Sequence, residues 1–336
     1  MAGYKTVKGF NIQTRSSDPS NPISGEVWYN STSNDLKAYG NVAGAWAAST
    51  AMPAGRGLSA TIGTTTACIV IAGNVPPDTS TAGTVEWNGS SWTAGGALTR
   101  SPVPGGTSGQ LGFGTLTTAT VAGGHQASPL VTFTTLVEEY NGTSWTAVNE
   151  SSNGRNDGTA AGTNAAGLIM CGTTPGGTGK ETEEYDGTNW STGGELGNGR
   201  PRPQGSVCGT QTAALAIGGE SGPDTTVEEY NGSSWTAAPS VPTTSWNGGC
   251  SGIETAALSF AGGGGPSPSQ TGATFSYNGS TWSAEAALAT GRSYCNGCGS
   301  GTSAFLCGGG YPFTIPTNAN VEEWTSGESI MTFTDS

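Results

Sequence analysis

The sequence predicts an all-β protein made of repeated small sheets, and three observations support this fold class. The 336 residues include 57 glycines and 18 prolines, two residue types that disfavour helices. Charged residues make up only 10% of the chain, which leaves few long amphipathic stretches. Aromatic residues recur at regular places, whereas disordered chains are poor in aromatics and rich in charge. A packed β core is therefore expected.

An internal repeat is the strongest feature of the chain. The segments TVEWNGSSWTA, VEEYNGTSWTA, TEEYDGTNWST, VEEYNGSSWTA and TFSYNGSTWSA follow one another at intervals of 45 to 53 residues. Their first aromatic residues are Trp87, Tyr140, Tyr185, Tyr230 and Tyr277, and a degenerate sixth copy ends at Trp324. A fixed period of this length is typical of stacked units or of the blades of a closed ring.

Each repeat predicts four strands in a fixed order. The first is rich in small residues and ends in a glycine turn, at Gly63, Gly114, Gly162, Gly209, Gly252 and Gly301. The second is an apolar run that closes on glycine, and the third ends on the repeated aromatic residue. The fourth begins at a tryptophan after an Asn-Gly or Asp-Gly turn, a strong hairpin signal because these residues accept positive φ.

A four-stranded unit of this size cannot bury both of its faces, so the units must stack, and a closed ring of them is a β-propeller. Residues 51–336 hold six repeats, and residues 1–50 hold further strand-like pieces, with Tyr39 and Trp46 placed like the repeated aromatic pair. We predict one propeller domain of seven blades, in which the N-terminal segment is a divergent blade. Six blades, with this segment as an appendage or as the source of a shared strand, is the alternative.

The repeats resemble the kelch family of β-propellers. The shared features are the apolar strand ending in Gly-Gly, the later Tyr, the Trp one turn further on, and an Arg before the next glycine-rich strand. The resemblance covers about residues 50–330. Departures are the incomplete glycine pairs at Gly73 and Gly172, and residues 243–245, which replace the Arg in one unit. The resemblance implies four-stranded blades around an axis.

The charge balance excludes several classes of partner. The formal net charge is −13, which disfavours nucleic acid and anionic membrane surfaces. The best apolar run, residues 67–72, is too short to span a bilayer, so no membrane insertion is expected. The single histidine, His125, leaves no set of histidines for a metal site or a catalytic triad. We expect no catalytic residues, no metal and no cofactor.

Arginines recur between the fourth strand of one repeat and the first strand of the next, at Arg56, Arg100, Arg155, Arg200 and Arg292. In a propeller this connection lies on the same face as the 2–3 loop, so the arginines are predicted to form a partial ring around one mouth of the channel. They are candidate binding residues for an acidic ligand such as a carboxylate-bearing glycan. The alternative, which we favour, is that each Arg ties blades together through carbonyls or nearby Glu residues.

Glutamates recur on the third strands, at Glu86, Glu138, Glu139, Glu183, Glu184, Glu228, Glu229, Glu322 and Glu323. Adjacent side chains of a strand point to opposite faces, so a Glu-Glu pair does not supply two carboxylates to one site. Cys295 and Cys298 form a C-x-x-C without the second half of a zinc site, and buried thiols are expected. The Asn-Gly-Ser/Thr sequences match acceptor sites for N-glycosylation, but the need for Asn-Gly in the hairpin turn explains them.

The 2–3 loops differ between repeats while the rest is repeated, and loops on a rigid scaffold commonly carry binding specificity. The face that bears them is the candidate binding surface.

The N-terminal segment resembles segments of tail-fibre and other virion proteins of tailed bacteriophages. The matching residues are G-E-V-W-Y-N at 25–30 and L-K-A-Y at 36–39. The resemblance implies a non-enzymatic virion protein, a tail fibre or a decoration of the tail or head. Residues 1–50 would then be a virion-attachment element, as the alternative to a divergent blade. The protein would be assembled in the host cytoplasm, be present in several copies, and bind other virion proteins or a host-surface glycan or protein. The alternatives are a propeller glycosidase acting on host polysaccharide and a cellular protein-interaction propeller.

Overall fold

The computed structural model describes residues 12–76, 79–99, 107–126, 132–177, 179–203, 208–219, 225–243, 246–263, 270–299, 304–310 and 318–333. The chain divides into two compact units: Trp46–Trp324, which we call the propeller unit, and Met1–Ala45 with Thr325–Ser336, which we call the terminal unit. The boundary lies a few residues before the predicted one. The C-terminal residues belong to the terminal unit because the last long strand pairs with the first long strand.

The propeller unit is an all-β propeller made of antiparallel sheets. Five sheets have four strands each, in chain order from the inside outwards. Blade 1 has β4 (Ala60–Thr64), β5 (Ala67–Ile71), β8 (Thr84–Trp87) and β9 (Trp92–Ala94). Blade 2 has β11 (Leu111–Gly114), β12 (Ala119–Ala122), β15 (Val137–Tyr140) and β16 (Trp145–Ala147). Blade 3 has β17 (Thr159–Thr163), β18 (Ala166–Met170), β19 (Thr182–Tyr185) and β20 (Trp190–Thr192).

The other blades follow the same plan. Blade 4 has β21 (Gly209–Thr210), β22 (Ala213–Ile217), β23 (Val227–Tyr230) and β24 (Trp235–Ala238). Blade 5 has β25 (Gly249–Ile253), β26 (Ala256–Phe260), β27 (Thr274–Tyr277) and β28 (Trp282–Glu285). Blade 6 has β29 (Asn296–Gly299), β30 (Ala304–Gly308) and β31 (Val321–Phe333), and its fourth strand is β3 (Asp35–Ser49). The predicted strand order and the tryptophan starts of the fourth strands in blades 1 to 5 are confirmed.

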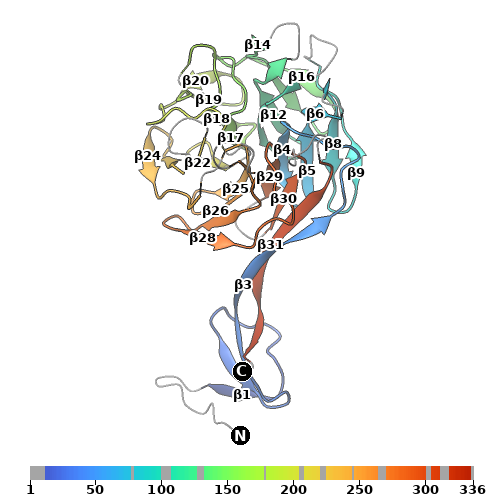
Figure 1. The fold of residues 1–336 in the computed structure, drawn as a ribbon, viewed down its shortest axis with the longest axis vertical. Coiled ribbons are helices and arrows are strands. Elements are labelled where there is room, and N and C mark those ends of the chain that lie inside the picture. Colours follow the sequence, from blue (N-terminus) through green and yellow to red (C-terminus); the bar gives the residue numbers. More distant parts are fainter. Residues whose placement is uncertain are drawn as a thin grey trace. The chain divides into compact units, whose positions relative to one another are not determined.

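The inner strands form a closed ring (Figure 1). Each lies beside the next, in the order β4, β11, β17, β21, β25 and β29, and β29 lies beside β4. The described residues therefore make six blades, and the preference for seven was wrong. The first fifty residues do not form a separate blade. Their long strand, β3, is the outermost strand of blade 6, which is the shared strand that the six-blade alternative predicted.

Trp46 shows how this closure works. Its ring lies 5.4 Å from that of Trp324 on the neighbouring strand and 5.1 Å from that of Phe260 in blade 5. Its indole Nε1 donates to Thr274 Oγ1 of blade 5 at 2.9 Å. In blade 4, Trp235 makes the equivalent bond to Thr182 of blade 3. Trp46 thus serves as the fourth-strand tryptophan of blade 6, supplied from the opposite end of the chain.

The turn glycines between the first two strands have backbone reasons for being glycine. Gly63, Gly114, Gly162, Gly209 and Gly252 have φ between +100° and +120°. A Cβ at Gly162 would stand 2.1 Å from the carbonyl oxygen of Ala166. Neither the left-handed conformation nor this contact leaves room for a side chain.

The outer hairpin follows the chemistry predicted for Asn-Gly. Asn141 Oδ1 accepts hydrogen bonds from the backbone N–H groups of Thr143 and Ser144, and the four other hairpins repeat the pattern, with Asp186 in blade 3. Tyr140 and Trp145 face each other across the turn with ring centroids 4.9 Å apart. The Trp145 indole N–H then donates to the Gly96 carbonyl at the end of the preceding blade. The aromatic pair therefore helps to pack one blade on its neighbour.

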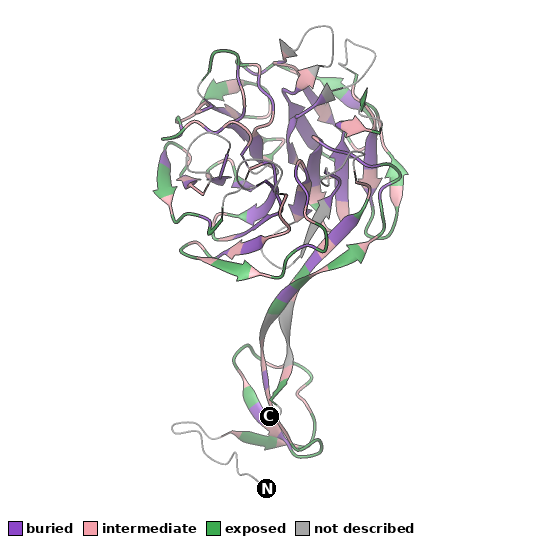
Figure 2. Cartoon of the chain, viewed as in Figure 1, coloured by how far each residue is buried: buried purple, intermediate pink, exposed green. Residues whose placement is uncertain are grey.

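Within each blade, burial decreases towards the outermost strand (Figure 2). The second strands are buried along most of their length, whereas the fourth strands are half-buried or exposed after their first residue. The apolar clusters lie between blades: Ile62 and Ile69 of blade 1 pack with Val121 and Tyr140 of blade 2. The core is thus divided into interfaces between neighbouring sheets.

The terminal unit contains β1 (Gln13–Arg15), β2 (Val27–Asn30) and the outer parts of β3 and β31. β2 and β3 form an antiparallel hairpin from residues 27–38, and Trp28 in it is fully buried. Asp18 accepts hydrogen bonds from Trp28 Nε1 and Asn30 Nδ2, and it pairs with Lys37 at 2.8 Å. These hydrogen bonds lower the pKa of Asp18, with that of Lys37 contributing most. Within the described part of the chain, no helix has the length and apolar character needed to cross a membrane.

Candidate functional site

The repeated arginines lie inside the blades and not around an open mouth. The side chains of Arg56, Arg155, Arg200 and Arg292 are at most 7% exposed, and Arg100 lies outside the described residues. Each guanidinium donates from Nη1 to two carbonyls, one at the end of the second strand and one at the start of the third; for Arg200 these belong to Gly218 and Thr226. The four described arginines therefore do not form an exposed binding ring, because the blade interior takes up their hydrogen-bonding capacity.

Three of these arginines pair with the first glutamate of the third strand in their own blade. The Nη2–Oε1 distances are 2.5 Å for Arg155 and Glu183, 2.8 Å for Arg200 and Glu228, and 2.6 Å for Arg292 and Glu322. The glutamates also accept backbone N–H groups from the connection that enters the blade, as Glu228 does from Gly197. These three arginines do bond to carbonyls and nearby Glu residues, but the contacts lie within one blade and do not tie two blades together: each Arg holds the connection, the second strand and the third strand of its own blade.

The two repeats that lack the glutamate differ in whether they keep the arginine. In blade 1 the position is Val85, and Arg56 bonds only to the carbonyls of Ala72 and Gly83 among its described partners. In blade 5 the position is Phe275, and the sequence carries Ser245 in place of the arginine. Charge and counter-charge are thus lost together in blade 5, which avoids an unpaired buried glutamate.

In blades 2 to 4, the second glutamate of the pair points to the next blade. Tyr185 of blade 3 donates its hydroxyl to Glu139 of blade 2 at 2.9 Å, and Tyr277 of blade 5 donates to Glu229 of blade 4 at 2.8 Å. Desolvation, with the hydrogen bond to Glu184, raises the pKa of Tyr230 to about 12. The Glu-Glu pairs therefore serve two different interfaces, as the alternation of a strand requires.

A ring of left-handed residues surrounds the axis, one from each blade. The six residues have φ between +50° and +69° and are Leu58, Gly109, Asp157, Arg202, Asn247 and Tyr294. Backbone N–H groups join them around the axis: Gly109 donates to Leu58, Asp157 to Gly109, Asn247 to Arg202, Tyr294 to Asn247, and Leu58 to Tyr294. Positive φ is uncommon for non-glycine residues and is a genuine outlier for bulky ones such as Leu and Tyr. Strained backbone of this kind is frequent at functional sites.

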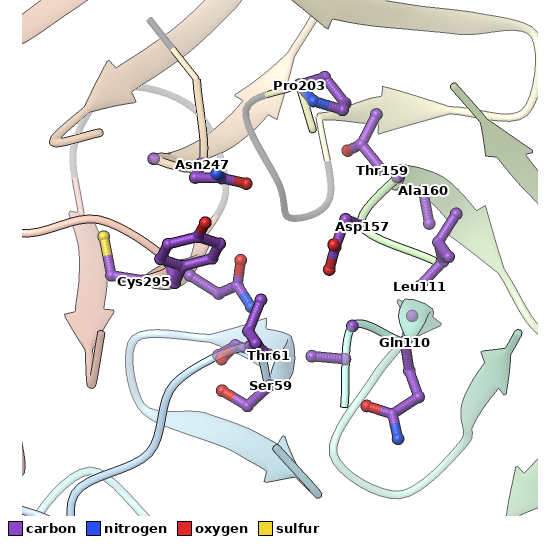
Figure 3. Close-up of a pocket in the computed structure, with 18 residues that line it drawn as sticks. Ser59, Thr61, Gln110, Leu111, Asp157, Thr159, Ala160, Pro203, Asn247 and Cys295 are labelled. Atoms are coloured by element: carbon purple, nitrogen blue, oxygen red, sulfur yellow. The ribbon is translucent and has the colours of Figure 1, made fainter. Parts of the chain in front are cut away.

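The residues of this ring and the first residues of the inner strands enclose an opening that we call the axial mouth. The space within it is about 510 Å³, open solvent included. Figure 3 shows side chains from several blades around it, among them Ser59, Thr61, Asp157, Thr159 and Asn247. The wall therefore combines hydroxyl and amide side chains with glycines and apolar side chains.

Two polar groups define the chemistry of the axial mouth. Asp157 lies 3.7 Å from Arg202 Nε, so this carboxylate has a cationic neighbour. Asn247 is 7% exposed, and its Nδ2 has no hydrogen-bond partner among the described residues. A buried unsatisfied donor destabilises a protein by about 1–3 kcal/mol, so this amide calls for a partner that the described residues do not supply.

The described parts of the variable loops lie on the same side as the axial mouth. Isolated bridges join the 4–1 connection of a blade to the start of its own 2–3 loop: Gly57 to Asn74, Asn156 to Thr173, and Trp246 to Gly263. The Trp246 ring also contacts the Tyr294 ring, with centroids 6.5 Å apart. In these blades, the predicted sharing of one face by the two kinds of connection is confirmed.

Cys295 and Cys298 are buried, as predicted. The pKa of the Cys298 thiol is raised mainly by its burial and also by a hydrogen bond with Cys68. His125 is half-buried in the short strand β13 (His125–Gln126). The described residues contain no group of three or more His, Cys, Asp or Glu placed to hold a metal ion.

Sequence reasoning missed the left-handed ring. Its members differ in residue type, and their shared feature is position: four of them stand two residues after a repeated arginine. That spacing is the one signal by which the ring could have been found.

Comparison with known proteins finds likeness of fold and not of sequence. No protein-family model matches the chain, and no curated protein matches it. Among the solved structures that are similar to it, the one described as "Structure of YjhT" has a TM-score of 0.64 and 15% identity. The match covers 81% of this chain and 96% of that chain. At this identity the likeness supports the fold alone, and that fold is an all-β propeller.

Proposed function

We propose that this chain is a non-enzymatic virion protein of a tailed phage, a tail fibre or a decoration of the tail or head, that binds its partner with one face of a propeller. The observation that carries the proposal is the motif at 25–30 and 36–39, which resembles segments of phage virion proteins. It forms a hairpin with a buried Trp28 in a unit separate from the propeller. One unit for attachment and one for binding is an arrangement that suits such a protein.

The binding role is proposed for the face that holds the axial mouth and the described starts of the variable loops. Its partners would be other virion proteins and a glycan or protein of the host surface. Several copies on one particle would turn weak single-site binding into strong avidity. The cysteines at 68, 171, 208, 250, 295 and 298 are free thiols, which suits assembly in the host cytoplasm.

A non-enzymatic role is supported by the engagement of the repeated carboxylates. Glycoside hydrolysis uses two carboxyl groups at one site. Here Glu183 is bonded to Arg155 inside blade 3, while Glu184 receives the hydroxyl of Tyr230 in blade 4. Incubating the protein with host polysaccharide is expected to release no sugar, and released reducing ends would support the glycosidase instead.

The proposal is tested by asking whether the protein is present in purified phage particles and exposed on their surface. Mass spectrometry of gradient-purified particles is expected to find this chain, and antibodies to it are expected to label the particle surface in electron micrographs. Purified protein is expected to slow adsorption of the particles to host cells. Particles that lack the chain, with the protein recovered instead in complexes of host proteins, would favour the cellular interaction propeller.

A further inference from the structure

We infer that the axial mouth is a binding site for a neutral, hydroxyl-rich ligand, namely one or two uncharged sugar residues at the end of a glycan. This inference rests on the proposed function for its biological meaning, but the site itself is argued from the geometry of the propeller unit.

The axial mouth has the build of a preformed small-ligand site. Its rim is held by the backbone hydrogen bonds between left-handed residues of neighbouring blades. Its wall is built from residues of several blades, so the lining is already in place before a ligand enters. A rigid rim reduces the entropy lost on binding, because little has to be ordered when the ligand enters.

Asn247 points to hydrogen bonding with a ligand. Its side chain is more than nine-tenths buried, it lines the axial mouth, and its Nδ2 lacks a partner among the described residues. A ligand hydroxyl or ring oxygen would accept from this amide. The hydroxyls of Ser59, Thr61 and Thr159 line the same space and can both donate and accept, as sugar hydroxyls do (Figure 3).

Charge disfavours ionic ligands. The chain carries a formal charge of −13, and the mouth contains the Asp157 carboxylate, so an anion is repelled. A cation would have to compete with Arg202, which lies 3.7 Å from Asp157. Leu58 is among the residues that line the same space, and an apolar side chain there suits the C–H face of a sugar ring. A peptide would need a deeper apolar pocket for an anchoring side chain.

The experiment is saturation-transfer NMR on the full chain, followed by titration of the probes that bind. The probes are the methyl glycosides of glucose, galactose and N-acetylglucosamine, with glucuronic acid, glucosamine and tetraglycine as charged and peptide counterparts. At least one neutral glycoside is expected to bind, with Kd in the millimolar range typical of a single sugar. Binding of a charged probe or of the peptide alone, or of none of the probes, would overturn the inference.

The decisive variant is Asn247→Gly. Glycine accepts the φ of +53° at this position, so the rim is retained while the amide is removed. The dissociation constant is expected to rise about fivefold or more, as loss of one hydrogen bond implies. Ala261→Gly is the matched control, because Ala261 is another left-handed, buried residue of blade 5 and does not line the axial mouth.

Unchanged binding in Asn247→Gly, or equal loss in both variants, would refute the site. Circular dichroism and thermal unfolding of both variants check that the fold is kept. Failure of this experiment leaves the particle experiment unaffected, because labelling of the virion does not depend on sugar binding. The two proposals can therefore fail separately.

Discussion

Single residues of the repeat have their roles assigned by partners that lie far away in the sequence. Arg200 reaches Gly218, Thr226 and Glu228, so one guanidinium connects three segments of blade 4. Both side chains of the ion pair are nearly or fully buried, with exposures of 2% and 6%. Such a pair is not strongly stabilising by itself, but the loss of one partner leaves an uncompensated buried charge.

Removing the arginine alone is therefore expected to be severe. Arg200→Ser should lower the free energy of unfolding by about 3–5 kcal/mol, because Glu228 stays buried without its partner. The double variant Arg200→Ser with Glu228→Phe copies Ser245 and Phe275 of blade 5 and should lose less than the single variant. Urea unfolding followed by tryptophan fluorescence measures both. Additive losses in the double variant would show that the two residues are not coupled.

The turn glycines offer a second test at the scale of one residue. Gly162→Ala places a methyl group 2.1 Å from the Ala166 carbonyl at φ +100°, and the loss of stability should be about 2 kcal/mol or more. Gly176→Ala is the control, since Gly176 also has positive φ, +67°, but has open space around its Cβ. Its loss should be about 1 kcal/mol. Equal thermal midpoints for the two variants would contradict the steric argument.

Between elements, the third strands carry the contacts that fix one blade against the next. Tyr230 on β23 donates to Glu184 on β19 at 2.5 Å, and the same contact recurs between blades 1 and 2, 2 and 3, and 4 and 5. Beside it, in blades 2 to 5, the two rings of the Tyr–Trp pair lie against each other, and the Trp donates its indole N–H to the preceding blade. Neighbouring sheets are thus joined by polar contacts near the outer rim and by apolar packing further in.

The tyrosine contacts make stability depend on pH in the alkaline range. The pKa of Tyr230 is about 12 in the folded chain against an ordinary 10.0, so the unfolded chain loses this proton first. Stability should therefore fall as pH rises from about 10 to about 12, and it should be unaffected by this group below that range. Tyr230→Phe removes the contribution, so its unfolding free energy should change less with pH than that of the natural chain. Parallel pH curves would contradict the assignment.

For the whole molecule, closure of the ring depends on the two ends of the chain. The last repeat supplies three strands of blade 6, and β3, from the start of the chain, supplies the fourth. Ser49 Oγ donates to Glu323 on the adjacent strand at 2.6 Å, which adds to the contacts of Trp46. The six blades therefore close only when both ends of the propeller unit have come together.

Trp46 is the residue on which this closure can be tested. Trp46→Ala removes ring contacts with Phe260 and Trp324 and the bond to Thr274, and should lower the free energy of unfolding by about 2–4 kcal/mol. Phe333→Ala is the control, because Phe333 is 49% exposed in the terminal unit. Hydrogen exchange should show faster opening of β31 and β3 in the Trp46 variant. Similar stability of the two variants would mean that Trp46 does not hold the ring closed.

How much could be predicted depended on the distance in sequence over which each feature is encoded. The strands, their order, the Asn-Gly turns and the turn glycines are set within about ten residues, and repetition made their patterns visible. For Arg200, the sequence allowed two roles, an exposed binding residue or a structural one. The burial of its side chain and its pairing with Glu228 decide between these roles. The pattern around Tyr39 and Trp46 suggested a seventh blade, although both residues lie on the single long strand β3. In the sequence, two aromatic residues on one strand have the same spacing as two on neighbouring strands of a hairpin.

The amino-acid sequence by itself determined that this chain is a propeller of four-stranded blades, since each blade repeats the local chemistry of the others. Only the tertiary structure decided that six blades close the ring with a strand borrowed from the first fifty residues, that the described arginines lie inside the blades, and that left-handed residues of different kinds frame the axial mouth. Local conformational preferences act between near neighbours in the chain, whereas closure, burial and pairing depend on which distant segments the fold brings together.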